Sequence, residues 1–323
     1  MSPEVSKSLF HLNTHCQQRR SVMFLLKFPH LHEHLRSMKK RLISFGHGYS
    51  ATAIAAQLDR SEWDIAGTSR SAAGLERLAA LGIHPLEWNS DESVKYLETS
   101  DAILTSIAPK EGRDPVLEVY GSVITENAGK YQWVGYLSTT GVYGDHAGGW
   151  VNETTPLTPS TERGKARVAA EAAWSTIPNL PLHIFRLAGI YGPGRGPFAK
   201  VLNGTAKRII KADQVFSRIH VDDIAQIVAA SLHAPDAGAI YNLCDDDPAP
   251  PQDVIAYAAE LLGKPLPPAI PFDEADMSPM ARSFYSESKR VDNTKIKQDL
   301  GITLIHPDYK SGLSAMLSSG SIS

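Results

Sequence analysis

The fold is decided by the stretch Arg41-Leu42-Ile43-Ser44-Phe45-Gly46-His47-Gly48-Tyr49-Ser50-Ala51. A short apolar run ends here in two glycines spaced by one residue, and a helical pattern of small residues follows. This order of strand, glycine turn and helix is the context in which G-x-G-x-x-[GA] holds a pyrophosphate. Gly46 can take the tight turn, Gly48 lets the backbone approach the phosphates, and Ala51 lets the helix pack close to the strand.

The start of the helix belongs to the same candidate site. At Tyr49 and Ser50 the helix N-terminus presents unpaired backbone N–H groups and a partial positive charge, and both favour phosphate. The alternative is an ordinary strand-to-helix turn, because a single motif of this kind is a weak signal. The choice depends on the sequence that follows.

Length and composition limit the class of protein. A chain of 323 residues can bury a large core and suits one large domain or two coupled ones. The net charge of −3 favours neither nucleic acid nor an anionic membrane surface as a partner. Cys16 and Cys244 cannot build a disulfide framework, so we expect a reducing compartment and a cytoplasmic location. There is no run of about 18 apolar residues, so we expect no transmembrane helix.

Residues 1–37 differ from the rest of the chain. They hold Arg19-Arg20, a short apolar patch at 22–26, and three histidines at positions 30, 32 and 34. The patch is too short for a signal peptide and lacks a cleavage site, and an organelle-targeting segment is only weakly marked. Nothing nearby fixes a metal geometry around the histidines. We predict that 1–37 is an extension outside the fold, which begins near Met38.

From residue 41 onward, apolar runs alternate with amphipathic stretches. Strands are predicted at 41–45, 63–69, 83–86, 101–107, 132–138 and 182–187, and helices at 72–81, 115–128 and 165–175. Such alternation predicts an α/β fold with a parallel, doubly wound sheet. Ligands bind outside the carboxyl ends of the strands in these sheets, so residues that follow strands are the candidate site residues.

The end of the second predicted strand indicates which dinucleotide binds. Ser69 and Arg70 stand there, and Arg70 comes 24 positions after Gly46. An acidic residue at this place would bind the ribose 2′-hydroxyl of NAD(H), whereas an arginine accommodates the 2′-phosphate of NADP(H). We therefore expect NADP(H), with NAD(H) as the other candidate, because a guanidinium supplies both charge and a bidentate fork. The alternative is a solvated arginine beside a helix capped by Ser71.

Four further motifs follow in a fixed order, at 137–144 (LSTTGVYG), 186–194 (RLAGIYGPG), 219–225 (IHVDDIA) and 239–243 (AIYNL). The first resembles the S-S/T-x-x-V-Y-G stretch of the extended short-chain dehydrogenases/reductases, the superfamily that contains the NAD-dependent epimerases and dehydratases. The next two resemble that superfamily's R-x-x-x-[IV]-Y-G-P-G and H-V-D-D motifs, and the last resembles its following strand. The resemblance covers about residues 41–315.

This resemblance implies a Rossmann-type sheet with a smaller C-terminal substrate domain. Residues 38–187 with 219–244 would form the NAD(P)-binding domain, and 188–218 with 245–323 the substrate domain. The site would lie between them and take a small-molecule substrate. A homodimer is the assembly that we consider.

The chain departs from the family where the catalytic pair should stand. The family has a Y-x-x-x-K pair at the start of the helix after the 137–144 motif, in which the lysine lowers the pKa of the tyrosine. Alignment places Arg163 at the tyrosine position and Arg167 at the lysine position. A second register uses Lys165 as the lysine but puts Thr161 at the tyrosine position. Both registers lack the tyrosine, so the chain resembles atypical members of the superfamily.

Three residues remain as candidates for the chemistry. Thr139 matches the family's catalytic Ser/Thr and could hydrogen-bond a substrate oxygen, or it could simply cap local backbone. Arg163 stays charged near neutral pH, so we expect it to bind a carboxylate or to stabilise negative charge. Arg167 could reach the ribose hydroxyls of the cofactor, as the family's lysine does. The alternative for both arginines is a solvated place in the first helical turn.

The histidine motif at 219–225 could suggest a metal. His220, Asp222 and Asp223 all fall in it, but the same motif begins a helix in metal-free family members. We expect Asp222 or Asp223 to cap that helix and expect no metal site.

Arginines in the predicted substrate-binding region would indicate an anionic substrate. Nucleotide-sugar epimerases usually carry a phosphate-binding arginine four residues before the motif histidine, where this chain has Phe216. A nucleotide-sugar substrate is therefore not favoured. Arg195, Arg218 and Arg282 are left as candidates for binding another anion.

Two functions follow from these residues. The first is an NADP(H)-dependent oxidoreductase or epimerase acting on a small, anionic molecule. The second is a protein that binds NADP(H) without turnover and senses its redox state. The complete substrate domain favours the enzyme, and the loss of the tyrosine–lysine pair favours the sensor.

Overall fold

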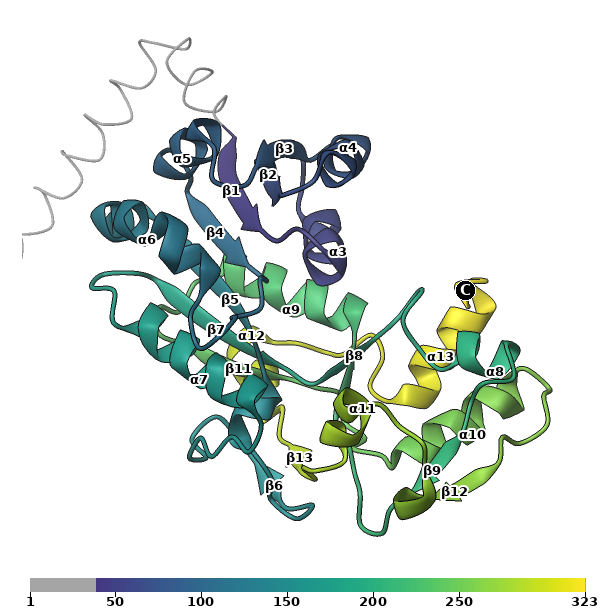
Figure 1. The fold of residues 1–323 in the computed structure, drawn as a ribbon. Helices are drawn as coiled ribbons and strands as arrows, with labels where there is room; N and C mark the ends of the chain where they lie inside the picture. Colours follow the sequence, from purple (N-terminus) through teal and green to yellow (C-terminus); the bar gives the residue numbers. More distant parts are fainter. Residues whose placement is uncertain (1–38, 323) are drawn as a thin grey trace, which may run out of the picture. The chain divides into compact units, whose positions relative to one another are not determined.

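The computed structural model describes residues 39–322, and its centre is a seven-stranded parallel sheet (Figure 1). The strand order is β11-β7-β5-β4-β1-β2-β3. The strands are β1 (Lys40–Phe45), β2 (Trp63–Ser69), β3 (His84–Glu87), β4 (Ala102–Thr105), β5 (Trp133–Thr139), β7 (Leu182–Leu187) and β11 (Ile240–Leu243). The predicted α/β fold with a doubly wound parallel sheet is confirmed.

The burial of the strands explains why the sequence marked them clearly. Strands β4 and β7 are buried along their whole length, as parallel strands covered by helices on both faces should be. The order of the sheet reverses at β1, since β2 and β3 lie on one side of it and β4, β5 and β7 on the other. Ligands bind at such a switch point, and the glycine turn after β1 lies there.

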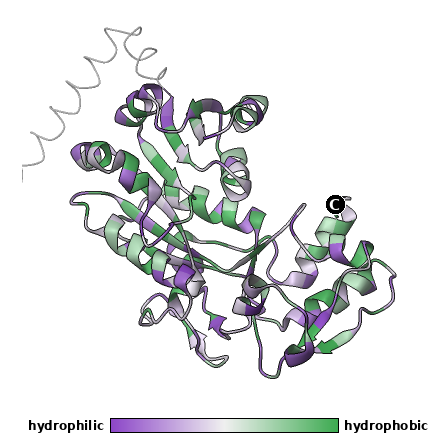
Figure 2. Ribbon diagram, viewed as in Figure 1, coloured by the Kyte–Doolittle hydropathy of each residue, from purple (hydrophilic) through white to green (hydrophobic). Residues whose placement is uncertain are grey.

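Helices cover both faces of this sheet. One apolar core receives side chains from α3 (Tyr49–Gln57), α4 (Ala72–Ala80) and α9 (Val221–His233), and the other from α5 (Asp91–Glu98), α6 (Pro115–Asn127) and α7 (Glu162–Ser175). Leu42 of β1 lies in the first core and Ile43 in the second, because successive side chains of a strand point to opposite faces. Figure 2 shows α9, which packs against α3, mostly in green for hydrophobic residues.

The remaining elements form three parallel two-stranded pairs and several helices. The pairs are β8 (Gly189–Tyr191) with β10 (Arg218–His220), β9 (Arg208–Ile210) with β12 (Ala269–Pro271), and β6 (Trp150–Val151) with β13 (Arg290–Val291). The helices are α8 (Phe198–Leu202), α10 (Pro251–Leu261), α11 (Pro279–Phe284), α12 (Thr294–Leu300) and α13 (Tyr309–Ser318). Tyr191, Val254 and Leu313 belong to an apolar cluster separate from the two sheet cores. The division into two domains stays a prediction.

Some element boundaries differ from those expected. The strands predicted at 63–69 and 182–187 have those bounds, whereas α7 begins at Glu162 instead of 165. Helix α5 was not predicted, because its signal is a capping box made by Ser90 and Ser93 in which serine replaces the usual Glu or Gln.

The predictions of an N-terminal extension and of no transmembrane helix both involve residues 1–38, which the structure does not describe. The extension at 1–37 lies outside the described residues. Between residues 39 and 322, every helix is too short or too polar to cross a bilayer.

Candidate functional site

The glycine turn has the geometry that phosphate binding needs. Gly46 has a φ of +73°, and a Cβ there would lie 2.6 Å from Cγ1 of Ile107, so only glycine fits. A Cβ on Gly48 would meet only the carbonyl oxygen of Gly46, at 3.7 Å, so the space in front of this residue is open. The turn is held from both neighbouring strands: Gly46 N–H donates to Oγ1 of Thr68, and the Ser106 hydroxyl donates to the Gly46 carbonyl.

The amino end of α3 is free to receive an anion. Gly48 is its N-cap, and no side chain of the described residues caps it. The first turn of Tyr49–Gln57, which includes Ser50, contains no acidic residue, so nothing in this helix opposes the positive end of its dipole. The residues present therefore fit the pyrophosphate of a dinucleotide.

Tyr49 joins this helix to the loop after β8. Its hydroxyl donates to the carbonyl of Pro193 over 3.0 Å, and the guanidinium of Arg195 lies 5.8 Å from its ring centroid. A positive charge from the C-terminal part of the chain thus stands beside the expected phosphate position.

Two cavities meet at the glycine turn, and Gly46 and Gly48 line both. The smaller, of about 420 Å³, lies over the end of β2 and is lined by Ser69 and Arg70. Two further cations, Arg77 and Lys110, line it too.

Some polar side chains around the smaller cavity already make hydrogen bonds with nearby backbone groups. Ser71 caps α4 as expected, and the Ser69 hydroxyl donates to the Ser71 carbonyl at 3.3 Å. Arg77 donates to the carbonyl of His47. Arg70 is exposed and extends from the end of β2, so its guanidinium is the group most free to meet a phosphate.

The larger cavity, of about 880 Å³, contains all three candidates for chemistry. Thr139 ends β5, and its Oγ1 accepts the N–H of Gly141 at 3.1 Å. The threonine therefore caps local backbone and also lines the cavity. Because its oxygen accepts that bond, its own O–H is left to donate to a ligand.

The two arginines of α7 behave differently. Arg167 donates to the Tyr136 hydroxyl at 2.9 Å and to the Leu137 carbonyl at 2.8 Å, which fixes it against the end of β5. Arg163 is exposed, and its guanidinium lies 4.8 Å from the ring centroid of Phe284. Both line the cavity, whereas Lys165, the lysine of the second register, pairs with Glu162 on the exposed face.

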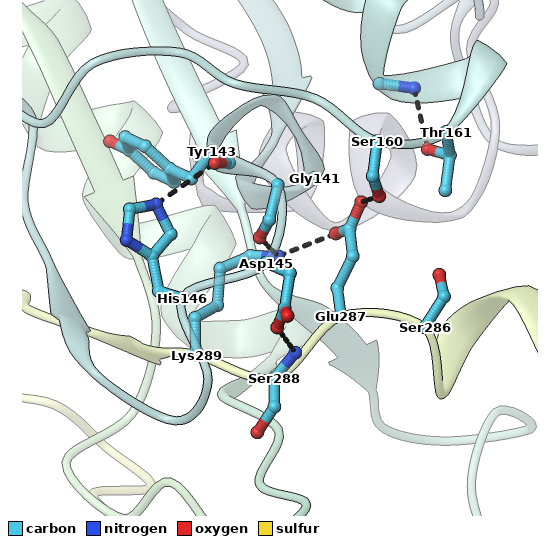
Figure 3. Close-up of polar contacts among 12 residues, drawn as sticks. Gly141, Tyr143, Asp145, His146, Ser160, Thr161, Ser286, Glu287, Ser288 and Lys289 are labelled. Carbon is cyan, nitrogen blue, oxygen red and sulfur yellow. Dashed lines mark hydrogen bonds and ion pairs between the residues drawn. The ribbon is translucent and has the colours of Figure 1, made fainter.

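Lys289 and Glu287 are cavity residues that the sequence did not indicate. They precede β13, and Figure 3 shows their side chains beside the loop that ends β5. Lys289 donates to the Gly144 carbonyl at 2.6 Å and to Oε2 of Glu287 at 2.7 Å. Oε1 of Glu287 accepts from the Ser160 hydroxyl at 2.6 Å. More than 100 residues separate this pair from α7, and no motif marked it.

The larger cavity is strongly positive. The cations that line it are Arg163, Arg167, Arg195, Lys200, Arg218 and Lys289, while Glu287 is the one acidic residue among the described residues of its wall. Arg282 is not among the residues that line this cavity: it donates to the Ala275 carbonyl and lies over the ring of Phe272, and its role in binding an anion stays a prediction.

Arg218 is a half-buried cation of this wall that is held by the local backbone. It donates to the carbonyls of Phe216 and Ala249, at 2.9 and 3.0 Å. Burial raises the pKa of the neighbouring Asp245 carboxyl to about 8, although the positive charge of Arg218 acts in the opposite direction.

The histidine motif is part of the framework. The expectation that Asp222 or Asp223 caps α9 is wrong, because His220 is the cap and its Nδ1 accepts the N–H of Asp222 at 3.2 Å. The Asp223 carboxylate instead accepts the N–H groups of Ile305 and His306.

His220, Asp222 and His306 are close enough together to resemble a ligand set. The lone pair of His220 Nδ1 is already used by the helix cap, whereas its Nε2 has no hydrogen-bond partner among residues 39–322. Burial and the nearby His306 lower the pKa of His220 to about 4, which keeps its ring neutral at pH 7.

Comparisons with known proteins give the following relatives. No family model matches the chain. A solved structure described as a functionally unknown conserved protein from Silicibacter pomeroyi DSS is 57% identical, with a TM-score of 0.84, over 87% of this chain and 99% of that one. Protein YeeZ of Escherichia coli K12 is 28% identical over 83% of this chain and 97% of its own.

A more distant structure is dTDP-glucose 4,6-dehydratase from Bacillus anthracis in complex with NAD. It is 17% identical, with a TM-score of 0.69, over 87% of this chain and 96% of that one. This likeness shows a shared fold.

Proposed function

We propose that this chain, which belongs to one family with the Silicibacter pomeroyi protein and has the fold of the NAD-dependent epimerases and dehydratases, binds NADP(H). The glycine turn and the amino end of α3 would hold the pyrophosphate, and Tyr49 and Ser50 begin that helix. The 2′-phosphate would enter the smaller cavity, where Arg70, Arg77 and Lys110 supply positive charge. NAD(H) would leave these three cations without a phosphate partner.

The reaction that we propose is oxidoreduction or epimerisation of a small anionic molecule. The observation that carries this proposal is the charge of the larger cavity, where six cationic residues face one acid among the described lining residues. The nicotinamide supplies the redox chemistry when it is bound. Thr139 would donate its free O–H to a substrate oxygen, Arg163 would bind negative charge, and Arg167 would hold the cofactor ribose.

A redox sensor without turnover remains the second candidate. The observation that favours it is that arginines occupy both positions of the proton-transferring pair. A guanidinium does not lose its proton near pH 7, so neither Arg163 nor Arg167 can act as a general acid–base group. A cytoplasmic location and a homodimer also remain predictions.

One assay separates the two candidates. NADPH absorbance is followed while the protein is offered a panel of 2-oxo acids and, separately, their amides. Oxidation with the acids but not with the amides supports the enzyme and its anionic substrate. NADPH binding supports the sensor if no compound oxidises NADPH and if the protein does not epimerise the matching 2-hydroxy acids, since epimerisation consumes no NADPH overall. A failure to bind NADPH contradicts both.

A further inference from the structure

Lys289 is a buried lysine with one hydrogen-bond donor to spare. Its residue exposure is 9%, and two of its three N–H groups donate to the Gly144 carbonyl and the Glu287 carboxylate (Figure 3). Within residues 39–322 the third finds no protein acceptor, and the residue lines the larger cavity. A fixed, largely dehydrated ammonium is thus presented to a ligand.

Both carboxylate oxygens of Glu287 take part in this arrangement. One of its oxygens accepts from Lys289 and the other from the Ser160 hydroxyl, and its side chain is 11% exposed. The carboxylate therefore orients the ammonium and leaves its third donor free. Orienting a lysine in advance removes much of the entropy that it would lose on binding a ligand.

Arg163 supplies a second cation at the same wall. Ser160, which holds Glu287, lies just before α7, and Arg163 lies in the first turn of that helix. The Arg163 guanidinium lies over the ring of Phe284, which comes three residues before Glu287. The start of α7 and the segment before β13 therefore bring Arg163 and Lys289 to one region of the cavity, although Glu162 in the same first turn offsets the positive potential of the helix amino end.

From this geometry we infer that Lys289 and Arg163 form the binding site for a carboxylate group of the substrate. Arg163 offers the planar fork that matches a carboxylate, and Lys289 offers a point charge. Glu287 is a positioning residue. The inference rests on the proposed function for its biological meaning, but the site consists of protein groups alone and can be tested without the cofactor.

The test is a calorimetric titration of the full chain with succinate, with and without NADPH. Lys289→Gln should weaken succinate binding at least about tenfold, because a charge-assisted contact is lost. Lys264→Gln, which removes an exposed lysine outside the cavity lining, is the matched control and should bind as the wild type does. The affinity for NADPH should be unchanged in both variants.

Glu287→Gln separates a charge effect from a structural one. The amide oxygen can still accept from Lys289, while the negative charge that competes with the ligand is gone. Succinate should bind several-fold more tightly to this variant, whereas a merely structural role for the pair predicts weaker binding.

Four results would overturn the inference. The first three are no succinate binding by the wild type at tens of millimolar, equal succinate affinity in Lys289→Gln and the wild type, and equal binding of succinate and uncharged succinamide. Tighter binding of inorganic phosphate than of succinate would also overturn it, because it would assign the site to a phosphoryl group. If NADPH fails to bind while succinate binding depends on Lys289, the proposed function fails and this inference stands.

Discussion

Arg70 carries the prediction of cofactor preference. Its exposed side chain lines the smaller cavity, where the 2′-phosphate of NADPH would lie. Arg70→Ala should therefore lower NADPH affinity by about 10- to 150-fold, or about 1.5–3 kcal/mol, and should leave NADH affinity unchanged. Calorimetry with both cofactors measures this, and equal affinity of the wild type for the two would rule the preference out.

His47 gives a prediction about pH. It lies between the two glycines, is 3% exposed, and neither ring nitrogen has a hydrogen-bond partner within residues 39–322. Burial, with smaller contributions from Arg77 and Arg60, lowers its pKa to about 4 from 6.5. The folded state thus favours the neutral ring, so its contribution to stability is present above pH 6.5 and is lost as the pH falls towards 4.

The measurement is the free energy of unfolding at pH 7 and at pH 5. The wild type should lose about 2 kcal/mol more than His47→Gln over this interval, since only its unfolded state takes up the proton. His84→Gln, which removes an exposed histidine, is the control and should lose as much as the wild type. The same loss in His47→Gln as in the wild type would show that His47 is not responsible.

The alignment of helix α7 with the family's catalytic helix, which places Arg167 at the lysine position, can be tested by mutation. Arg167 is fixed against β5 by Tyr136 and Leu137, whereas Arg163 extends towards Phe284. Arg167→Ala should weaken NADPH roughly tenfold through the ribose, and Arg163→Ala should spare NADPH. Titration of the two variants with NADPH decides this, and the alignment of α7 onto the family's lysine must be abandoned if Arg167→Ala binds as the wild type does.

The elements that could be predicted are those whose signal is local. The bounds of β2 and β7 were predicted correctly, whereas β4, which is buried throughout, was predicted too long. The glycine turn was recognisable from six residues. Helix α5 was missed because its capping box has Ser93 at the position where Glu or Gln is usual. An aspartate was expected to cap α9 because aspartate is a common N-cap residue, but the ring of His220 caps this helix instead.

Only the site residues that come from the central sheet and its helix α7 could be predicted from the sequence. Thr139, Arg163 and Arg167 follow recognisable motifs, so their place in one cavity could be expected. Lys289 and Glu287 could not, because they reach this cavity through the pairing of β13 with β6, two residues from each strand. Tertiary pairing over such a distance leaves no periodic signal in the sequence.

The folded part of the molecule should not need the N-terminal extension, residues 1–37. Residues 1–37 have no place in the alternating pattern of strands and helices, so their removal should leave the fold and the cofactor site intact. A chain that starts at Met38 should keep the melting temperature and the NADPH affinity of the full chain. A fall of several degrees in melting temperature would show that the extension packs on the core.

We expect NADP(H) to bind at the glycine turn, where the two cavities meet, with an anionic substrate in the larger cavity beside it. A crystal structure of the full chain with NADPH and succinate tests this most directly. We expect the pyrophosphate at the amino end of α3, the 2′-phosphate beside Arg70, and a succinate carboxylate between Arg163 and Lys289. A dinucleotide bound away from Gly46 and Gly48, or succinate bound away from Lys289, would contradict it.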